Sequence, residues 1–464
     1  MSSSSGPWAR RSLWIAPLAA IAVDVACMLG GLPQAAAHTA AVTTLTAMWW
    51  ILEPIPVPAT SLIPFALLPL LDVVDHKTVA SAYGHTLILL LLGGFVLSTA
   101  MEKSGAHRRL ALGMVRMVGG RGGRRLVLGF MLATAVCSMW ISNTATVLML
   151  MPVAAAVMAT ESESLRVPLL LGIAYAASIG GLGTPVGTPP NVIFIGAYEE
   201  LAGKEIGFIE WMKIGIPVVI VMLPLAWLWL TRGIKESKPV PLPESEPWSV
   251  AEKRVLVVFF LTALAWVTRG HPMGGWSTWF GVPGAGDSTV ALAAVVVLFL
   301  MPDGRGGKML DWETANRIPW GLLILFGGGI AIAKAFDSSG LADALGSFLA
   351  DDLGIATWPA VAMIATLCLT VTFLTEITSN TATTTLLMPV LFAAAMAAEL
   401  PPEALMIPAT LSASCAFMLP VATAPNAVVY GTGHVTTQRM AREGLILNLG
   451  GVIILTGMCT WLVI

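Results

Sequence analysis

The sequence contains little charge. Of its 464 residues, only 11% are Asp, Glu, Lys or Arg, and the mean hydropathy is +0.82. A soluble domain keeps about a quarter of its residues charged to satisfy a surface in contact with water. This chain therefore cannot be surrounded mainly by water, and a lipid bilayer is the solvent that fits. The net charge of −2, without a patch that combines basic and aromatic residues, gives no basis for nucleic-acid binding.

Cysteine is also scarce. The five cysteines, Cys27, Cys137, Cys368, Cys415 and Cys459, are scattered and lie mostly inside apolar runs. An odd number without metal-ligand spacing predicts neither a disulfide framework nor a zinc site. We interpret them as small, buried hydrophobic side chains.

What the chain has in abundance is apolar stretches that can cross a bilayer, which takes about 20 residues. The first, 13–32, follows two arginines and is better explained as a membrane helix with its N-terminus inside than as a signal peptide. The other candidate spans are 40–54, 58–72, 85–101, 166–198, 212–231, 252–269, 288–302, 318–333, 404–434 and 442–463. Two further stretches, 127–158 and 357–399, carry the triplet Ser-Asn-Thr in the middle, and we expect them to re-enter the membrane. About 11 spans then remain.

The distribution of basic residues predicts the orientation. The segment 103–125 holds the densest basic run, and we expect the Arg232–Arg254 linker and the loop with Arg305, Lys308 and Arg317 on the same face. Segments assigned to the other face, such as 199–211 and 334–356, are acidic or poor in Lys and Arg. The positive-inside rule then places the N-terminus in the cytoplasm and the C-terminus outside, in what we expect to be a bacterial inner membrane.

The two halves of the chain repeat. A Gly-Gly block near 93 recurs near 327, and Ser-Asn-Thr-Ala-Thr begins at 142 and again at 379. The block 184–191, Thr-Pro-Val-Gly-Thr-Pro-Pro-Asn, matches Leu-Pro-Val-Ala-Thr-Ala-Pro-Asn at 419–426. The segment after the first Gly-Gly block is basic and its counterpart is acidic, so the two should lie on opposite faces. This pattern predicts an inverted repeat, which is characteristic of secondary transporters.

The two Ser-Asn-Thr triplets predict a polar site inside the membrane. A non-helical tip at that depth must line a wet cavity or be buried in protein. Ser, Asn and Thr cap helix N-termini, which attract anions, and their oxygens together with nearby carbonyls suit a small cation. Neither tip carries Arg or Lys, so bound cations would have to neutralise a dianion. The alternative is that these side chains only join helices by hydrogen bonds, but two copies, each followed by a Pro-Asn break, favour a site.

These motifs resemble those of the divalent-anion:sodium symporter family, which carries di- and tricarboxylates and, in some branches, sulfate. The resemblance covers essentially the whole chain and implies an all-α polytopic membrane protein. It implies a homodimer in which each protomer has a scaffold domain and a transport domain that slides across the membrane like an elevator. The implied divisions are scaffold at 1–126 and 252–356, and transport domain at 127–231 and 357–464, joined by the cytoplasmic linker 232–251. Each transport half would hold a hairpin (127–158 and 357–399) and a broken helix (166–198 and 404–434).

The resemblance also implies the ligands. Substrate carboxylates would be held by the two triplets and two loop threonines, namely Ser142, Asn143, Thr144, Thr188, Ser379, Asn380, Thr381 and Thr423. Two or more sodium ions would couple transport, the first held by Ser138, Ser142, Asn143 and Gly187. The second would be held by Thr375, Thr378, Asn380 and Ala422. Asn191 and Asn426 would brace the broken helices.

The implied function is sodium-coupled import of C4-dicarboxylates such as succinate, malate and fumarate. Two intact triplets favour a carboxylate over sulfate, and the hydroxyls of Ser138 and Thr375 favour sodium coupling. Sodium-independent dicarboxylate exchange, citrate or sulfate symport, and a channel remain alternatives. An intramembrane enzyme is disfavoured because no histidine lies near either triplet serine in the sequence. Ala424 stands where a second proline is common, and we expect it to affect loop rigidity or substrate size preference.

Four other titratable residues invite a functional interpretation. Glu376, in the second hairpin, is ionisable at membrane depth and is a candidate by default. It would either contact a substrate or cation, or accept hydrogen bonds from amides of its own hairpin. We expect packing or interface roles for Asp24 and Glu53, and a membrane-surface or dimer-arm role for His107.

Overall fold

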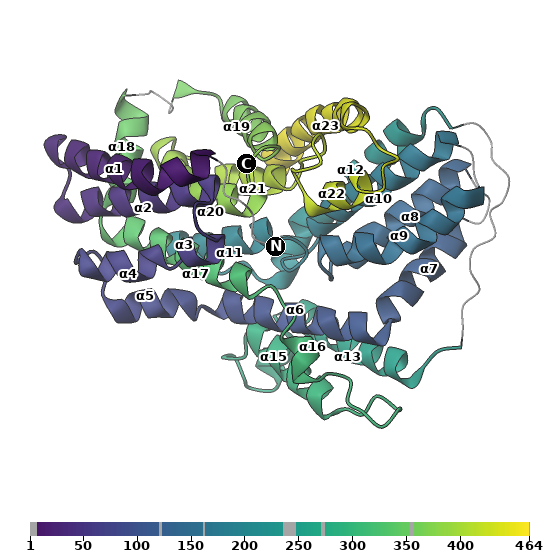
Figure 1. Cartoon of the computed structure of the whole chain (residues 1–464). Helices are drawn as coiled ribbons and strands as arrows, with labels where there is room; N and C mark the ends of the chain where they lie inside the picture. Colours follow the sequence, from purple (N-terminus) through teal and green to yellow (C-terminus); the bar gives the residue numbers. More distant parts are fainter. Residues whose placement is uncertain are drawn as a thin grey trace.

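A computed structural model describes residues 7–119, 123–160, 163–234, 247–270, 274–352 and 357–463. In these residues every regular element is a helix, apart from one isolated bridge between Pro302 and Lys308 (Figure 1). Six of the described helices are long and apolar enough to cross a membrane. The predicted all-α class is confirmed, whereas the number of spans stays a prediction.

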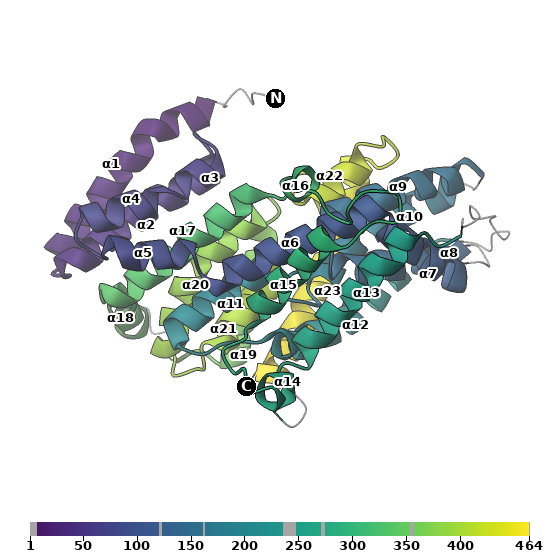
Figure 2. The same ribbon diagram turned by 90° about the horizontal axis from the view of Figure 1, so that it is seen from below.

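The N-terminal helices form one edge of the molecule, distant from α7–α10 in both views (Figure 2). They are α1 (Pro7–Leu29), α2 (Gln34–Leu52), α3 (Val57–Thr60), α4 (Ile63–Leu70) and α5 (His76–Tyr83). Within the predicted span 58–72, the turn at Ser61 and Leu62 separates α3 from α4, and whether this stretch crosses the membrane stays a prediction. Pro64 has no N–H to donate to the carbonyl of Thr60, four residues earlier.

The first repeat follows. Its helices are α6 (Thr86–Ser104), α7 (Ala106–Gly119), α8 (Gly123–Ser138), α9 (Asn143–Thr160), α10 (Glu163–Gly181), α11 (Pro189–Ala202) and α12 (Phe208–Thr231). The helices α8 and α9 form the predicted first hairpin, and α10 and α11 are the two parts of the predicted broken helix. The break at 182–188 is tight: a Cβ at Gly187 would overlap the carbonyl oxygen of Gly181 and lie 3.0 Å from its Cα.

Four helices precede the second repeat: α13 (Val250–Val267), α14 (Gly275–Trp279), α15 (Asp287–Leu300) and α16 (Trp312–Ala315). The second repeat then follows the order of the first from its Gly-Gly helix onward, with α17 (Trp320–Ser338), α18 (Leu341–Ser347), η1 (Phe348–Asp352), α19 (Ala360–Leu374), α20 (Asn380–Ala397), α21 (Glu403–Ala413), α22 (Ala424–Tyr430) and α23 (Thr437–Val463). The helices α19 and α20 form the second hairpin. The second broken helix consists of α21 and α22, with the break at 414–423.

Ion pairs show which helix ends share a face of the molecule. At the end that carries the basic segment 103–125, here called the basic end, Lys103 pairs with Asp311. At the same end Arg109, on α7, pairs with Glu252 at the start of α13, with Nε 2.6 Å from Oε1. The basic end therefore gathers the end of α6, α7, the start of α13 and the loop before α16.

The opposite end is marked by a second group of pairs. Lys334, near the end of α17, lies 3.1 Å from Glu200 at the end of α11. Arg269, just after α13, lies 2.7 Å from Glu205 and 2.9 Å from Asp287 at the start of α15. The broken helix α10–α11 therefore runs from the basic end to the opposite end, and the first hairpin, which precedes it, opens at the basic end.

The second hairpin opens the other way. Its last helix, α20, leads into α21, whose first residue, Glu403, accepts a hydrogen bond from Tyr198 Oη on α11 at the opposite end. The broken helix α21–α22 then returns to the basic end, where Glu443 on α23 pairs with Arg232 after α12. Two hairpins that open to opposite ends are the geometry expected of an inverted repeat.

Candidate substrate and cation site

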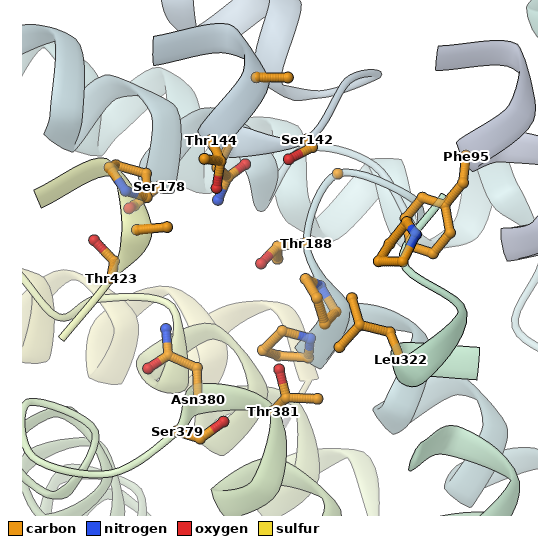
Figure 3. A pocket seen from close by; sticks show the side chains of 18 of the residues that line it. Phe95, Ser142, Thr144, Ser178, Thr188, Leu322, Ser379, Asn380, Thr381 and Thr423 are labelled. Atoms are coloured by element: carbon orange, nitrogen blue, oxygen red, sulfur yellow. The ribbon is translucent and has the colours of Figure 1, made fainter. Parts of the chain in front are cut away.

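Both hairpin tips and both helix breaks line one cavity of about 1040 Å³. Figure 3 shows Ser142 and Thr144 on one side of it, Asn380 and Thr381 on the facing side, and Thr188 between them. All of the residues predicted to hold carboxylates line this cavity: Ser142, Asn143, Thr144, Thr188, Ser379, Asn380, Thr381 and Thr423. Residues that are 237 positions apart in the repeated triplets thus meet in one site.

Helix N-termini face the cavity from both halves. The helices α9 and α20 begin at the two triplet asparagines, and α11 begins directly after Thr188. Ser379 caps α20 by accepting a hydrogen bond from the Ala382 N–H at 3.4 Å. The first N–H groups of a helix have no partner within it and carry partial positive charge, so this arrangement attracts anions.

The first tip is held in place by aromatic packing. Trp140, in the turn of the hairpin, stacks on Phe208 of α12 with ring centroids 5.7 Å apart, and on Trp266 of α13 at 6.5 Å. Phe259 meets the edge of the same ring at 5.3 Å. An aromatic cluster of this size, with Phe208 and Trp266 buried, fixes the position of the triplet that follows it.

Charged side chains line the cavity only away from the tips. They are Glu53, Glu102, Lys103 and Arg317, at the basic end. The Arg317 side chain is 69% exposed, so the cavity reaches solvent there. None of the residues that form the ion pairs of the opposite end lines the cavity. The site is therefore open toward the basic end and closed toward the other.

Oxygen atoms crowd together beside the first tip. The amide oxygen of Asn143 lies 2.5 Å from Ser138 Oγ, 3.2 Å from the Gly187 carbonyl oxygen and 3.3 Å from the Ala177 carbonyl oxygen. The single hydroxyl proton of Ser138 can serve either Asn143 or Ala177, whose carbonyl is 2.8 Å away, but not both. Two arrangements satisfy this group: the amide turns so that its NH₂ donates, or a cation lies among the oxygens. The structure thus gathers Ser138, Asn143 and Gly187 as predicted, and adds the Ala177 carbonyl.

The second tip has a similar but looser group. The Asn380 Oδ1 atom is buried and has no hydrogen-bond partner among the described residues. Thr375 is fully buried behind the tip and donates to carbonyls of its own helix, at 3.0 Å to Val371 and 3.1 Å to Thr372. Thr378 and Ala422 line the cavity with Asn380. Because each threonine hydroxyl donates within the hairpin, its lone pairs stay available to a cation.

The two Pro-Asn motifs brace the breaks, as expected. Asn191 donates from Nδ2 to the carbonyls of Gly181 at 3.0 Å and Thr184 at 2.8 Å. Asn426 donates in the same way to Ala416 at 3.1 Å and Leu419 at 3.0 Å. Each side chain replaces N–H donors that an uninterrupted helix would supply to these carbonyls.

Glu376 is not among the residues that line the cavity, and its hydrogen bonds are not to its own hairpin, as one of the two alternatives expected. Its carboxylate accepts hydrogen bonds from the N–H groups of Met418 and Leu419, both at 2.9 Å, and these belong to the second helix break rather than to its own hairpin. Asn448 Nδ2 donates to the same carboxylate at 2.7 Å. The sequence reasoning missed Asn448, although a lone asparagine within the apolar run 442–463 was a usable signal.

The remaining titratable residues have clearer surroundings. Asp24 Oδ1 lies 2.9 Å from His38 Nδ1, which joins α1 to α2. Glu53 is not merely a packing residue, because it lines the cavity, at a positive φ of 46°. Burial lowers the pKa of His107, whose Nδ1 lies 3.0 Å from the Met101 carbonyl oxygen, and this contact joins α7 to α6.

Comparison with known proteins identifies the family. Residues 8–464 match the family described as the sodium:sulfate symporter transmembrane region. The chain belongs to this family. A member of the sodium:sulfate symporter family is a membrane transporter and not an enzyme, and the resemblance to divalent-anion:sodium symporters is confirmed.

Two curated relatives are similar over most of their length. The sodium-dependent dicarboxylate transporter SdcS of Staphylococcus saprophyticus is 42% identical over 442 residues, which are 89% of this chain and 84% of that protein. SdcS of Staphylococcus aureus (strain NCTC 8325) is 39% identical over 450 residues, 91% of this chain and 85% of that protein. Among solved structures, the Alcanivorax borkumensis YdaH transporter has a TM-score of 0.58 at 16% identity. That match covers 83% of this chain and 87% of YdaH, and it shows a shared fold alone.

Proposed function

We propose that this chain is a sodium-coupled symporter that imports C4-dicarboxylates such as succinate, malate and fumarate. The observation that carries the proposal is the single cavity in which two Ser-Asn-Thr tips face each other without a basic side chain on either. A dianion placed between the tips meets helix N-termini, hydroxyls and amides, but no full positive charge. The names of the SdcS relatives support both the ion and the substrate class.

The two tips account for two carboxylates. One carboxylate lies against the N-terminus of α9, with Ser142, Asn143 and Thr144. The other lies against the N-terminus of α20, with Ser379, Asn380 and Thr381. Thr188 and Thr423 come from the breaks and close the sides of the site. A substrate with a carboxylate at each end of a short carbon chain fits this division better than a compact tetrahedral anion does.

Two sodium ions supply the missing positive charge. We assign one to the oxygens of Ser138, Ser142, Asn143 and Gly187, and one to those of Thr375, Thr378, Asn380 and Ala422. Each ion lies beside a tip, so it stabilises the bound dianion and its own oxygen ligands together. Without the ions the site is a poor host for two negative charges, which provides a physical reason for coupling.

The closed and open ends fit an elevator cycle. The cavity has one wall from the tips and breaks and another from α2, α6 and the α16–α17 segment, which we assign to the transport and scaffold domains. We place the basic end in the cytoplasm, with the N-terminus inside and the C-terminus outside, so the site faces inward here. Movement of the transport domain in a homodimer would expose the same site on the other side.

Uptake of labelled succinate by proteoliposomes tests the proposal. We expect accumulation against a substrate gradient with sodium outside, and none when choline replaces sodium. Equal uptake in sodium-free buffer would refute sodium coupling, and a requirement for internal dicarboxylate would indicate exchange. A competition panel of malate, fumarate, citrate and sulfate defines the substrate; strong competition by sulfate alone contradicts the proposed carboxylate site.

A further inference from the structure

Two side chains satisfy three consecutive backbone amides of the second helix break. Asn448 Oδ1 accepts from the Phe417 N–H at 3.2 Å, and Glu376 accepts from the N–H groups of Met418 and Leu419. The Asn448 NH₂ group then donates to Glu376, which closes the network. Since Glu376 and Asn448 are 3% and 0% exposed, no solvent replaces these bonds. If these hydrogen bonds were lost, the N–H groups of Phe417, Met418 and Leu419 would be left without partners.

The helix α23 packs directly against the second helix break and supplies Asn448 to this network. A Cβ at Gly444 would overlap the carbonyl of Phe417, so only glycine lets the helix backbone lie against the break. Asn448 stands one helical turn after Gly444 and therefore reaches the same segment. The break is thus held from α23 on one side and from the second hairpin, through Glu376, on the other.

The first half makes the equivalent connection without charge. Met139 stands three residues before Ser142, as Glu376 stands three residues before Ser379. In the first half the Thr184 hydroxyl donates to the Met139 carbonyl, and Thr184 opens the block that Leu419 opens in the second half. The repeat therefore ties each tip to its break at the same two positions. Only the second half does so with a carboxylate.

We propose that Glu376 is a positioning residue that clamps the second hairpin tip to the second helix break and thereby builds the second cation site. This inference rests on the proposed function. The proposed ligands Thr375 and Asn380 lie on the hairpin side of the clamp, and the Ala422 carbonyl lies on the break side, where Ala422 N–H donates to Leu419 at 3.2 Å. The clamp fixes the separation of ligands that belong to two different elements.

The negative charge of Glu376 acts in the same direction. Both carboxylate oxygens accept N–H hydrogen bonds, as an ionised carboxylate does. A cation bound at the second tip is attracted by this charge across a medium of low dielectric, and the first site has no such neighbour in its tip or break. We therefore expect Glu376 to raise the sodium affinity of the second site rather than to touch the substrate.

The test is Glu376→Gln in the full-length protein, with sodium titrated against choline at constant ionic strength. A glutamine keeps the shape but points an NH₂ group at one of the two amide donors and removes the charge. We expect the sodium concentration for half-maximal uptake to rise about tenfold, the order expected from losing a charge-assisted hydrogen bond. The KM for succinate at saturating sodium should change much less. The midpoint of sodium-induced thermal stabilisation should move in parallel with the uptake midpoint.

Glu443→Gln is the matched control. Glu443 is also a buried carboxylate, 2% exposed, but it pairs with Arg232 and Arg439 at the basic end. We expect this variant to lose thermal stability with an unchanged sodium midpoint. Glu376→Asp keeps the charge but is one methylene shorter, and it should give a sodium midpoint between those of wild type and Glu376→Gln. If Glu376→Gln fails to fold, a raised midpoint in Glu376→Asp supports the inference and a wild-type midpoint contradicts it.

The outcomes are distinguishable. If Glu376→Gln and Glu376→Asp fold and keep the wild-type sodium midpoint, with only a lower maximal rate, the clamp does not set the cation site and the inference is wrong. If wild-type uptake and wild-type thermal stability both ignore sodium, the proposed function itself fails. A shift of the midpoint in Glu376→Gln but not in Glu443→Gln supports the inference.

Discussion

Substitution of Gly187 by alanine is the most direct probe of the first helix break. The added Cβ would overlap the Gly181 carbonyl oxygen and lie 3.0 Å from both the Cα and the carbonyl carbon of Gly181. These are backbone atoms and cannot rotate away. Gly181, on the other side of this contact, also leaves no room for a side chain. A Cβ there would lie 3.0 Å from the Gly187 carbonyl oxygen and from the Asn143 amide oxygen.

The expected magnitude follows from this geometry. Overpacking in a close-packed interior costs about 1–3 kcal/mol when side chains can yield, and a clash with backbone belongs at the upper end of that range. The relief is a shift of the 182–188 segment, which carries the Gly187 carbonyl. A shift of that oxygen separates it from Asn143 and Ser138, so sodium binding should weaken together with stability.

Gly113→Ala is the matched control, since Gly113 lies on the exposed face of α7 and a Cβ there meets nothing within 4 Å. It should leave uptake unchanged and raise stability slightly, because alanine is favoured over glycine within a helix by about 1 kcal/mol. Thermal unfolding of the purified proteins and sodium-dependent uptake in proteoliposomes report the two effects. If Gly187→Ala matches Gly113→Ala in both assays, the close approach of the two segments is not needed, and the assignment of Gly187 to a cation site loses its basis.

Three further predictions use the same assays. Asn143→Ala and Asn380→Ala should each abolish sodium-driven uptake while keeping a monodisperse, folded protein; retained uptake in either would exclude that asparagine as a ligand. Glu200→Gln removes the ion pair with Lys334 at the closed end, and the loss of this half-buried pair costs on the order of 1 kcal/mol. We expect cysteines placed at that end to react faster with a membrane-impermeant label. Unchanged labelling contradicts a role for this ion pair in keeping the end closed. Hydrogen bonds from the Lys103 side chain and from Thr314 lower the pKa of Asp311 to about 2. Its contribution to stability is therefore fully present above its unfolded pKa near 3.8 and lost as pH falls through 2. The Tm gap between wild type and Asp311→Asn should be level near neutrality and shrink as pH falls from about 4 toward 2; a gap at pH 2 as large as at neutrality refutes this.

The sequence alone sufficed to predict which residues would meet in the site. The triplets at 142 and 379 are far apart in the chain, but the repeated order of motifs required an inverted arrangement, and the cavity lining matches it. Short polar motifs within apolar runs are strong signals, because lipid forbids unpaired backbone at that depth except where protein or a wet cavity surrounds it. The bracing roles of Asn191 and Asn426 were implied by the family resemblance, and their hydrogen bonds agree with it.

What could not be predicted depends on contacts between distant elements. Pro64 indicated an interruption within 58–72, but because the stretch is mostly apolar we predicted one continuous span, whereas the structure has α3 and α4. The partners of Glu376 come from residues 418 and 419, and from Asn448, 72 positions away. No periodicity within the hairpin indicates such a contact, since it depends on how closely α23 approaches the break. The side on which the cavity opens is likewise a property of domain packing rather than of any motif.

The absence of Arg and Lys from both tips explains why the site depends on helix N-termini, hydroxyls and amides. An arginine at a tip would hold a dianion by itself, and substrate would then bind equally well with or without sodium. Ser, Asn and Thr leave the neutralisation to ions, and linkage requires that substrate strengthen ion binding by the same factor as ions strengthen substrate binding. Among the described residues that hold the tips in place, Glu376 carries a carboxylate, which in the proposed mechanism would repel the anion and attract the cation. In the proposed mechanism, the second cation site would therefore bind sodium before substrate, and this order would prevent transport of substrate without its coupling ion.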